Sequence, residues 1–172
     1  MQTRFATARD ARALARIYNE GIEERIATFE TRPRTPEEIQ AWFEGKHPIV
    51  VVEEDGVVIS FANTSPYSTR ECYSGVAEFS VYAARETRGR GAGTLAMEAL
   101  MEAAEGAGFW TLVSRVFVEN TPSRALLRGL GFREVGIYEK HGRLDGRWRD
   151  VVIVERLIPA NCGDLDDGAR ET

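Results

Sequence analysis

Cysteine and histidine are scarce in this sequence, which contains two of each among 172 residues. Cys72 and Cys162 lie far apart, and the chain has neither a CxxC pair nor a cluster of cysteine with histidine. Protein zinc sites need such clusters, so we expect no metal site. Two isolated thiols are typical of a protein kept in a reducing compartment.

A basic excess and a long apolar run are also lacking. The formal net charge is −5, and nucleic-acid binding needs a concentrated basic surface, so we expect no nucleic-acid partner. No apolar stretch approaches the ~18 residues of a membrane-spanning helix. Residues 1–7 lack the apolar core of a signal peptide. These absences predict a cytoplasmic protein with no membrane partner.

Apolar residues recur with two spacings, one typical of strands and one typical of helices. Strands are expected over residues 2–6, 48–53, 57–63, 76–83, 110–118, 132–138 and 148–157, and helices over 7–24, 35–45, 91–106 and 122–130. Strands outnumber helices and three follow one another, which predicts an α+β fold with a mixed, mostly antiparallel sheet flanked by helices. Residues 1–158 are expected to form one domain, and residues 159–172 a disordered tail.

A glycine-rich loop joins one expected strand to the helix after it. Gly89, Gly91 and Gly93 can adopt backbone angles closed to other residues, and each of the first two follows an arginine. At a helix N-terminus such a loop favours an anion, here a pyrophosphate. The lysine of a P-loop is absent, and Thr94 stands where a dinucleotide fingerprint has its last glycine. Taken alone, the loop could also be a flexible helix entry with solvated arginines.

The stretch Arg88-x-x-Gly91-x-Gly93 after a strand resembles the coenzyme A signature of the GNAT superfamily of N-acetyltransferases. Within it, the chain is similar to the phosphinothricin N-acetyltransferase-like enzymes. The matching stretches are residues 17–20, residues 27–30, Trp42-Phe43, Glu78-x-Ser80-Val81-Tyr82, Asn120-x-x-Ser123, Gly131-Phe132 and Trp148-x-Asp150-Val151. The resemblance covers residues 2–158 and implies the GNAT fold, acetyl-CoA as co-substrate, a small-molecule amine acceptor and a homodimer.

The resemblance also implies a cofactor site. In the family, the strand before the loop diverges from its neighbour and pairs with the pantetheine arm of coenzyme A, while the loop binds the pyrophosphate. Carried over, the contacts come from Val81, Tyr82, Ala83, Arg88, Gly89, Arg90, Gly91, Ala92, Gly93, Thr94, Asn120 and Ser123. Asn120 could instead cap the following helix, and the two roles are compatible.

Direct acetyl transfer needs a base for the ammonium proton and donors for the oxyanion. Glu78 matches the glutamate that resembles a general base in the related enzymes. Strand alternation places it on one face with Ser80 and Tyr82. Without the resemblance, Glu78 could equally be a solvated carboxylate on a strand.

Two further catalytic candidates follow from the resemblance. His141 lies in a Lys-His-Gly run similar to one near the end of the related enzymes, although three residues are inserted after it here. Leu127 occupies the usual place of the acid that protonates the thiolate. Tyr138 is therefore the candidate replacement, unless the thiol leaves without an acid.

The acceptor is expected to contact Arg70 and Tyr73, in the loop before the base, together with Phe29 and Glu30. Related enzymes often carry two arginines in that loop, and a serine replaces the first one here. The resemblance implies an amino-acid-like acceptor such as phosphinothricin, methionine sulfoximine or a related analogue. The acidic pairs along the chain leave open an aminoglycoside or polyamine acetyltransferase, and the missing acid leaves open a coenzyme A-binding sensor without activity.

Overall fold

The computed structural model describes residues 1–163, which form a seven-stranded sheet in the order β1-β2-β3-β4-β5-β7-β6. The strands are β1 (Gln2–Phe5), β2 (Ile49–Glu54), β3 (Val57–Pro66), β4 (Val76–Ala83), β5 (Thr111–Phe117), β6 (Arg133–Leu144) and β7 (Arg147–Leu157). Neighbouring strands are antiparallel except for β4 and β5, which are parallel. The predicted α+β fold with a mixed, mostly antiparallel sheet is confirmed.

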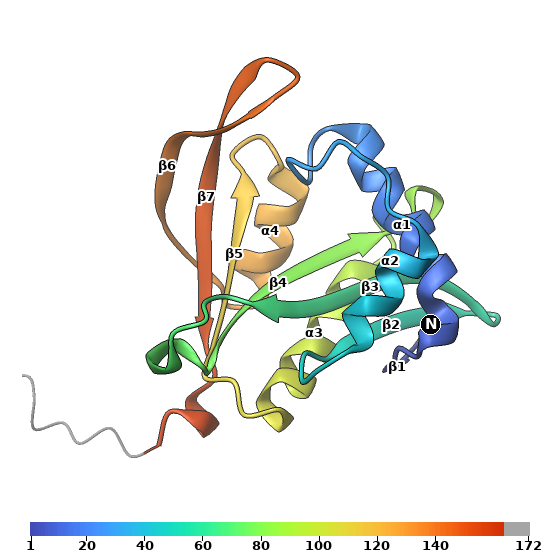
Figure 1. Cartoon of the computed structure of the whole chain (residues 1–172), viewed down its shortest axis with the longest axis horizontal. Coiled ribbons are helices and arrows are strands. Elements are labelled where there is room, and N and C mark those ends of the chain that lie inside the picture. Colours follow the sequence, from blue (N-terminus) through green and yellow to red (C-terminus); the bar gives the residue numbers. More distant parts are fainter. Residues whose placement is uncertain (164–172) are drawn as a thin grey trace, which may run out of the picture.

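Helices cover both faces of this sheet (Figure 1). They are α1 (Ala11–Glu24), α2 (Pro36–Gln40), α3 (Ala92–Gly106) and α4 (Thr121–Gly129). The start of α2 follows from its sequence, because Thr35 Oγ1 accepts a hydrogen bond from the Glu38 N–H and Pro36 needs no intrahelical partner. No helix of the described part is long and apolar enough to cross a membrane.

Alternation along the strands divides the apolar side chains between two cores. One core packs α3 and α4 against side chains such as Ala62 and Phe79. The other packs α1 and α2 against residues such as Val51 and Phe61. The face that carries α1 and α2 is therefore the face to which Glu78 points, since Glu78 precedes Phe79 on β4.

The parallel pair β4–β5 is short. It joins Val76 to Thr111 and ends where Glu78 pairs with Val113, whereas β5 continues beside β7 as far as Phe117. Figure 1 shows β4 and β5 running in different directions beyond this point. The sheet thus opens along the second half of β4, where one edge of that strand has no neighbouring strand among the described residues.

Strand β6 is longer than predicted, and the sequence-based boundary at residue 138 is wrong. The strand continues to Leu144 and closes a hairpin with β7 at Asp145 and Gly146, both of which have positive φ. An irregular stretch between Tyr138 and Gly142 interrupts the pairing. This bulge disrupts the two-residue alternation, which is why the pattern indicated a loop.

The prediction of a disordered tail from residue 159 is wrong at its beginning. Pro159–Asn161 forms a 3-10 turn. The Asn161 Nδ2 group donates to the carbonyl oxygens of Glu105 and Phe109, each at 2.8 Å. These bonds fix the turn against the end of α3. The rest of the predicted tail, residues 164–172, lies outside the described residues.

Candidate active site

A row of polar side chains crosses the sheet between two apolar clusters. Asn63 pairs with Ser80, and Ser65 pairs with Glu78, across β3 and β4. On one side of this row lies the core under α1 and α2, and on the other a smaller cluster around Phe117. Ser65, Glu78 and Ser80 of this row line a pocket of about 550 Å³, which we call the acceptor pocket.

Three side chains meet on the wall of the acceptor pocket. Arg115 on β5 donates from Nη2 to Glu78 Oε1 at 2.6 Å, and its Nη1 lies 3.3 Å from His141 Nε2. An arginine only donates, so Nε2 of His141 is the acceptor and the ring proton is on Nδ1. Two of the predicted catalytic residues, from β4 and β6, are thus joined through an arginine that the sequence did not single out.

The connection between α1 and α2 forms one wall of the acceptor pocket. Phe29 packs its ring against Phe117 at 4.7 Å between centroids. The same ring lies so close to Gly142 that an added Cβ would come within 2.7 Å of it. Glu30 also lines the pocket and pairs with Arg34 at 3.1 Å. Phe29 and Glu30, both predicted from the sequence, therefore lie in the wall that faces Glu78.

Asn63 holds a polar atom without a partner. It is 8% exposed, and its Nδ2 group donates to the Thr64 carbonyl at 3.3 Å. Its Oδ1 atom is buried and has no hydrogen-bond partner among the described residues. Asn63 lines a second cavity of about 420 Å³ that shares Ser65, Ser80 and Tyr82 with the acceptor pocket. A buried carbonyl oxygen of this kind favours a ligand with a hydrogen-bond donor.

The gap between β4 and β5 is a separate narrow cavity that reaches the acceptor pocket. Both are lined by Phe79, Ser80 and Arg115. Backbone groups on a strand point alternately to its two edges. The Ala84 N–H donates to Ile59 on the β3 side, so Val81 and Ala83 direct their backbone groups towards the gap.

Tyr82 does not fit its predicted backbone role. Its carbonyl points to β3 and accepts a hydrogen bond from Ser60 Oγ at 2.8 Å. Its side chain instead lines the acceptor pocket beside Tyr18, with ring centroids 5.0 Å apart. Burial raises the pKa of the Tyr82 hydroxyl, so the phenol stays protonated at neutral pH.

The glycine-rich loop leads directly into α3. Gly91 is the N-cap residue with a φ of +88°, Gly89 has a φ of +75°, and no side chain of residues 1–163 caps the helix. The first N–H groups of α3, from Ala92 onwards through Gly93 and Thr94, are therefore available for an anion. Gly93 also allows close packing, because an added Cβ would lie 3.1 Å from Leu126 Cδ1 of α4.

The two arginines of the loop are held by carboxylates. Arg88 pairs with Glu24 at the end of α1 and donates from Nε to the Ala83 carbonyl at 3.2 Å. Arg90 pairs with Glu54 at 2.7 Å. The backbone at the start of α3 therefore presents the more direct anion site, with the two guanidinium groups beside it.

Asn120 and Ser123 line the gap between β4 and β5. Asn120 is also the N-cap of α4, since its Oδ1 accepts from the Ser123 N–H at 3.3 Å. The capping role left open by the sequence is thus present, together with a position suited to ligand contact. Leu127 lies at the same gap, and its side chain is buried in the core.

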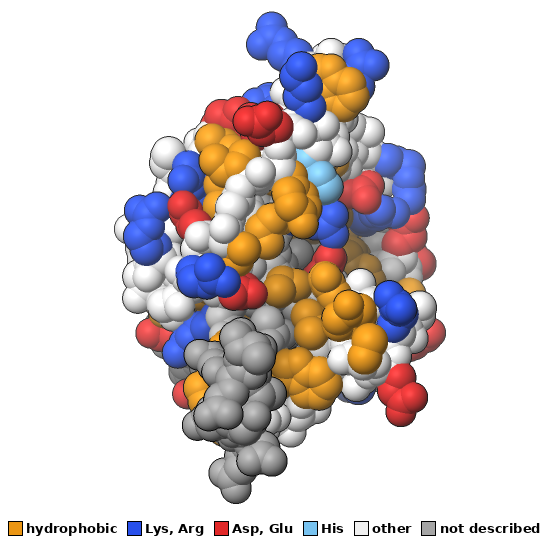
Figure 2. Space-filling model, turned by 90° about the vertical axis from the view of Figure 1, so that its left-hand side faces the viewer, with side chains coloured by type: hydrophobic (Ala, Val, Ile, Leu, Met, Phe, Trp, Pro, Cys, Tyr) orange, Lys and Arg blue, Asp and Glu red, His pale blue; other side chains and the backbone are white. Residues whose placement is uncertain are grey.

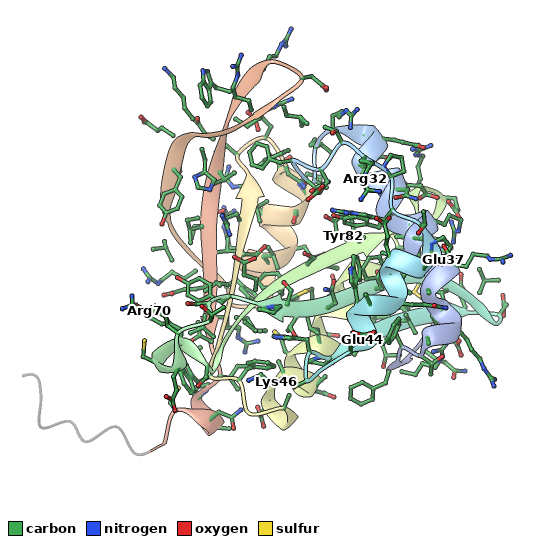
Figure 3. The ribbon with its side chains drawn as sticks, viewed as in Figure 1. Arg32, Glu37, Glu44, Lys46, Arg70 and Tyr82 are labelled. Atoms are coloured by element: carbon green, nitrogen blue, oxygen red, sulfur yellow. The ribbon has the colours of Figure 1, made fainter. Side chains whose placement is uncertain are left out.

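Three of the predicted catalytic and acceptor-binding residues line neither the acceptor pocket nor the gap. Tyr138 is 53% exposed, with its ring 5.0 Å from that of His141. Arg70 and Tyr73 lie on the connection between β3 and β4, and Figure 3 shows Arg70 well away from Tyr82. The roles predicted for these three residues stay predictions, because within a single chain none of the three lies at the acceptor pocket or the gap.

Arg115 is the functional candidate that sequence reasoning missed. A weak signal exists, because Arg115 is the one charged residue in the strand Thr111–Phe117. A charge in an otherwise apolar or small-residue strand indicates a site, but only the parallel register of β4 and β5 brings it to Glu78.

Comparison with known proteins identifies the family. The model of the acetyltransferase (GNAT) family matches residues 14–132. This chain belongs to the GNAT acetyltransferase family. It is 32% identical to a phosphinothricin N-acetyltransferase of Streptomyces coelicolor, over 92% of this chain and 96% of that protein. It is 30% identical to an L-methionine sulfoximine/L-methionine sulfone acetyltransferase of Pseudomonas paraeruginosa, over 88% and 91% of the two chains.

A solved GNAT structure agrees with the same assignment. The crystal structure of a phosphinothricin acetyltransferase from Sinorhizobium meliloti in complex with acetyl-CoA has a TM-score of 0.85 and 31% identity, and the match covers 91% of this chain and 88% of that one. The protein is an acetyl-CoA-dependent N-acetyltransferase. The uncapped start of α3 at Gly91 suits the pyrophosphate of this co-substrate, and the open edge of β4 suits its pantetheine arm. Residues 1–163 contain no cluster of three or more His, Cys, Asp or Glu that could hold a metal ion.

Proposed function

We propose that this enzyme acetylates the α-amino group of a small amino acid, of the kind represented by methionine sulfoximine and phosphinothricin. The observation that carries the proposal is the position of Glu78, which faces the acceptor pocket at the residue where β4 separates from β5. A carboxylate beside the mouth of the acetyl-CoA gap can accept the ammonium proton. Relatives named for these acceptors support the same class.

The surroundings of Glu78 suit a small acceptor. The acceptor pocket, of about 550 Å³, falls in the range of small-molecule sites. The Val81 N–H, which faces the gap, is the donor we propose for the oxyanion of the acetyl carbonyl. Tyr138 does not line the gap, so we propose that the thiol leaves without a dedicated acid, which its ordinary pKa permits.

Three of the acidic residues that suggested a polycationic acceptor, Glu23, Glu24 and Glu38, pair with arginines. Glu24 pairs with Arg85 and Arg88, and Glu38 pairs with Arg32. An aminoglycoside or polyamine would have to displace these arginines. The acidic residues are therefore weak support for a polycationic acceptor. An amino acid, with one ammonium and one carboxylate, requires no such patch.

An acceptor panel tests the proposal. Purified enzyme and acetyl-CoA are incubated with L-methionine sulfoximine, phosphinothricin, common amino acids, spermidine and an aminoglycoside, and thiol release is followed. We expect the highest kcat/KM with an α-amino acid. Turnover of spermidine or the aminoglycoside alone would contradict the proposal.

Substitution of Glu78 separates the base from a structural carboxylate. Glu78→Gln should reduce kcat by about 10²–10⁴-fold near neutral pH and leave acetyl-CoA affinity unchanged. Glu155 on β7 is a matched control, since its side chain is 32% exposed against 31% for Glu78 and it also pairs with an arginine. An equal loss of rate in Glu155→Gln would mean that the effect is not that of a base.

We further propose that the enzyme is a cytoplasmic homodimer. Apolar side chains are exposed on β6 and β7, where Ile137, Tyr138 and Trp148 are 53%, 53% and 55% exposed. Figure 2 shows hydrophobic side chains spread over this side of the molecule. Such a surface supports contact with a second copy. Sedimentation velocity should give a dimer, and Ile137→Lys should shift it to the monomer. The free thiols of Cys72 and Cys162 suit a reducing compartment.

A further inference from the structure

The carboxylate proposed as the base already has a partner in the acceptor pocket. Arg115 lies 2.6 Å from Glu78, and the two side chains are 48% and 31% exposed. A guanidinium at this position competes with a substrate ammonium for the same carboxylate oxygen. Arg115 therefore has to move before the ammonium can take its place on Oε1 of Glu78.

Arg115 is also the only lysine or arginine among the described residues that line the acceptor pocket. The second carboxylate of the wall, Glu30, has its own cation, Arg34, at 3.1 Å. The cavity beside Asn63 is lined by no lysine or arginine of the described chain. A negatively charged group on the acceptor thus finds one lysine or arginine in the part of the pocket wall that the structure describes, and this residue is the partner of the base.

The strands allow this guanidinium to turn. β5 pairs with β4 only as far as Val113, and Arg115 lies two residues further along, where the strands diverge. Its side chain reaches back towards Glu78 across the widening gap. Turning towards the pocket needs rotation of the side chain and no change in the pairing of the sheet.

We propose that an amino-acid acceptor inserts its two charges into the Glu78–Arg115 ion pair. The α-carboxylate takes the place of Glu78 on the guanidinium, and the α-ammonium takes the place of Arg115 on the carboxylate. Arginine is suited to this exchange, because its planar fork binds a carboxylate through two hydrogen bonds. The inference rests on the proposed function and makes Arg115 the residue that selects α-amino carboxylates.

The exchange also frees Oε1 of Glu78 for the ammonium when an acceptor with a carboxylate binds. The ammonium gives one proton to Glu78, and the nitrogen lone pair forms the C–N bond to the acetyl carbon. The C–S bond breaks, and its electron pair leaves with the sulfur of coenzyme A. The nitrogen loses a second proton, which goes to the thiolate, so the products are the N-acetyl amino acid, the free thiol and one proton passed from Glu78 to water.

Three matched acceptors test this inference: the amino acid that the wild-type enzyme uses best, its α-carboxamide, and the corresponding amine without the carboxyl group. We expect kcat/KM for the amino acid to exceed that for the carboxamide by roughly 10- to 150-fold, the factor for a charge-assisted hydrogen bond. Equal use of the acid and the carboxamide by the wild-type enzyme would overturn the inference, whatever the behaviour of any variant.

Arg115→Ala should then change specificity rather than general activity. We expect kcat/KM for the amino acid to fall by the same factor, while the rate with the carboxamide does not fall, because Glu78 has lost its competitor. Arg115→Lys should restore part of the preference for the acid. A purely structural role predicts equal losses with all three acceptors, which would contradict the proposal.

Arg133→Ala is the matched control, since Arg133 forms a 2.5 Å ion pair with Glu155 on the same sheet. It should leave the acid-to-carboxamide ratio unchanged, and a change of that ratio as large as that in Arg115→Ala would contradict the assignment. The two proposals fail differently. Absence of turnover with any α-amino acid would refute the proposed function, whereas turnover with an unchanged ratio in Arg115→Ala would refute only the exchange at Glu78.

Discussion

Gly142→Ala offers a sharp test of how the acceptor pocket is closed. An added Cβ would lie 2.7 Å from Phe29 Cε1 and 2.8 Å from its Cζ. Carbon atoms in contact are about 3.5–4.0 Å apart, so the ring would have to move by about 1 Å. Phe29 cannot move freely, because its other side packs on Phe117. Overpacking of this kind costs about 1–3 kcal/mol.

The consequence should be seen mainly in acceptor turnover. A displacement of about 1 Å at a positioning group can reduce the rate by up to ~10²-fold, so we expect kcat/KM for the acceptor to fall by about 10- to 100-fold. Acetyl-CoA affinity should stay unchanged, since Gly142 lines the acceptor pocket and not the gap. The melting temperature should drop by about 2–4 °C for each kcal/mol of folding stability lost.

Gly136→Ala is the control on the same strand, since an added Cβ there would meet no atom of the described chain within 4 Å. Steady-state kinetics with varied acceptor and varied acetyl-CoA, together with a melting curve, decide the matter. Equal kinetics for Gly142→Ala and Gly136→Ala would refute the reasoning that Phe29 forms the wall of the acceptor pocket.

Three further predictions concern other parts of the chain. Asn120→Ala should lose about 1 kcal/mol of stability and weaken acetyl-CoA binding, whereas Asn120→Ser should keep the helix cap and show only the binding loss. Arg4 holds the pKa of Asp10 below its usual 3.8. The Arg4–Asp10 ion pair therefore stabilises the fold above that pH, and this stabilisation is lost as the pH falls through the lowered pKa. Asp10→Asn should have a lower melting temperature at neutral pH and a smaller loss of stability on acidification. The buried Oδ1 of Asn63 favours an acceptor that donates a hydrogen bond, so methionine sulfoximine should be used better than methionine sulfone, and Asn63→Leu should remove the difference.

Much of the fold could be predicted from local sequence. The Asp55-Gly56 turn, with φ values of +51° and +78°, joins two runs rich in β-branched residues that form the β2–β3 hairpin. The loop that ends at Gly91 lies between a strand and an amphipathic helix, as expected. The face that carries Glu78 also followed from alternation. These features depend on neighbours within a few residues, which the sequence displays directly.

Features that depend on distant residues could not be predicted. The backbone of Tyr82 turns towards β3 because of the register between two strands, which alternation alone does not define. The partnership of Arg115 with Glu78 depends on a parallel pairing between segments 37 positions apart. The extension of β6 past Tyr138 depends on a bulge that β7 accommodates. Each of these features depends on tertiary contacts, which override or complete the local sequence pattern.

The central claim, that α3 begins at the acetyl-CoA pyrophosphate site, is tested most directly by calorimetric titration of acetyl-CoA into two matched variants. Gly91 and Gly108 flank opposite ends of α3, with φ values of +88° and +86°, and an added Cβ at either meets nothing of residues 1–163 within 4 Å. Replacement by alanine should therefore cost a similar ~1–2 kcal/mol of stability at each. The account predicts weaker acetyl-CoA binding for Gly91→Ala and wild-type binding for Gly108→Ala. Equal affinities in the two variants would contradict it.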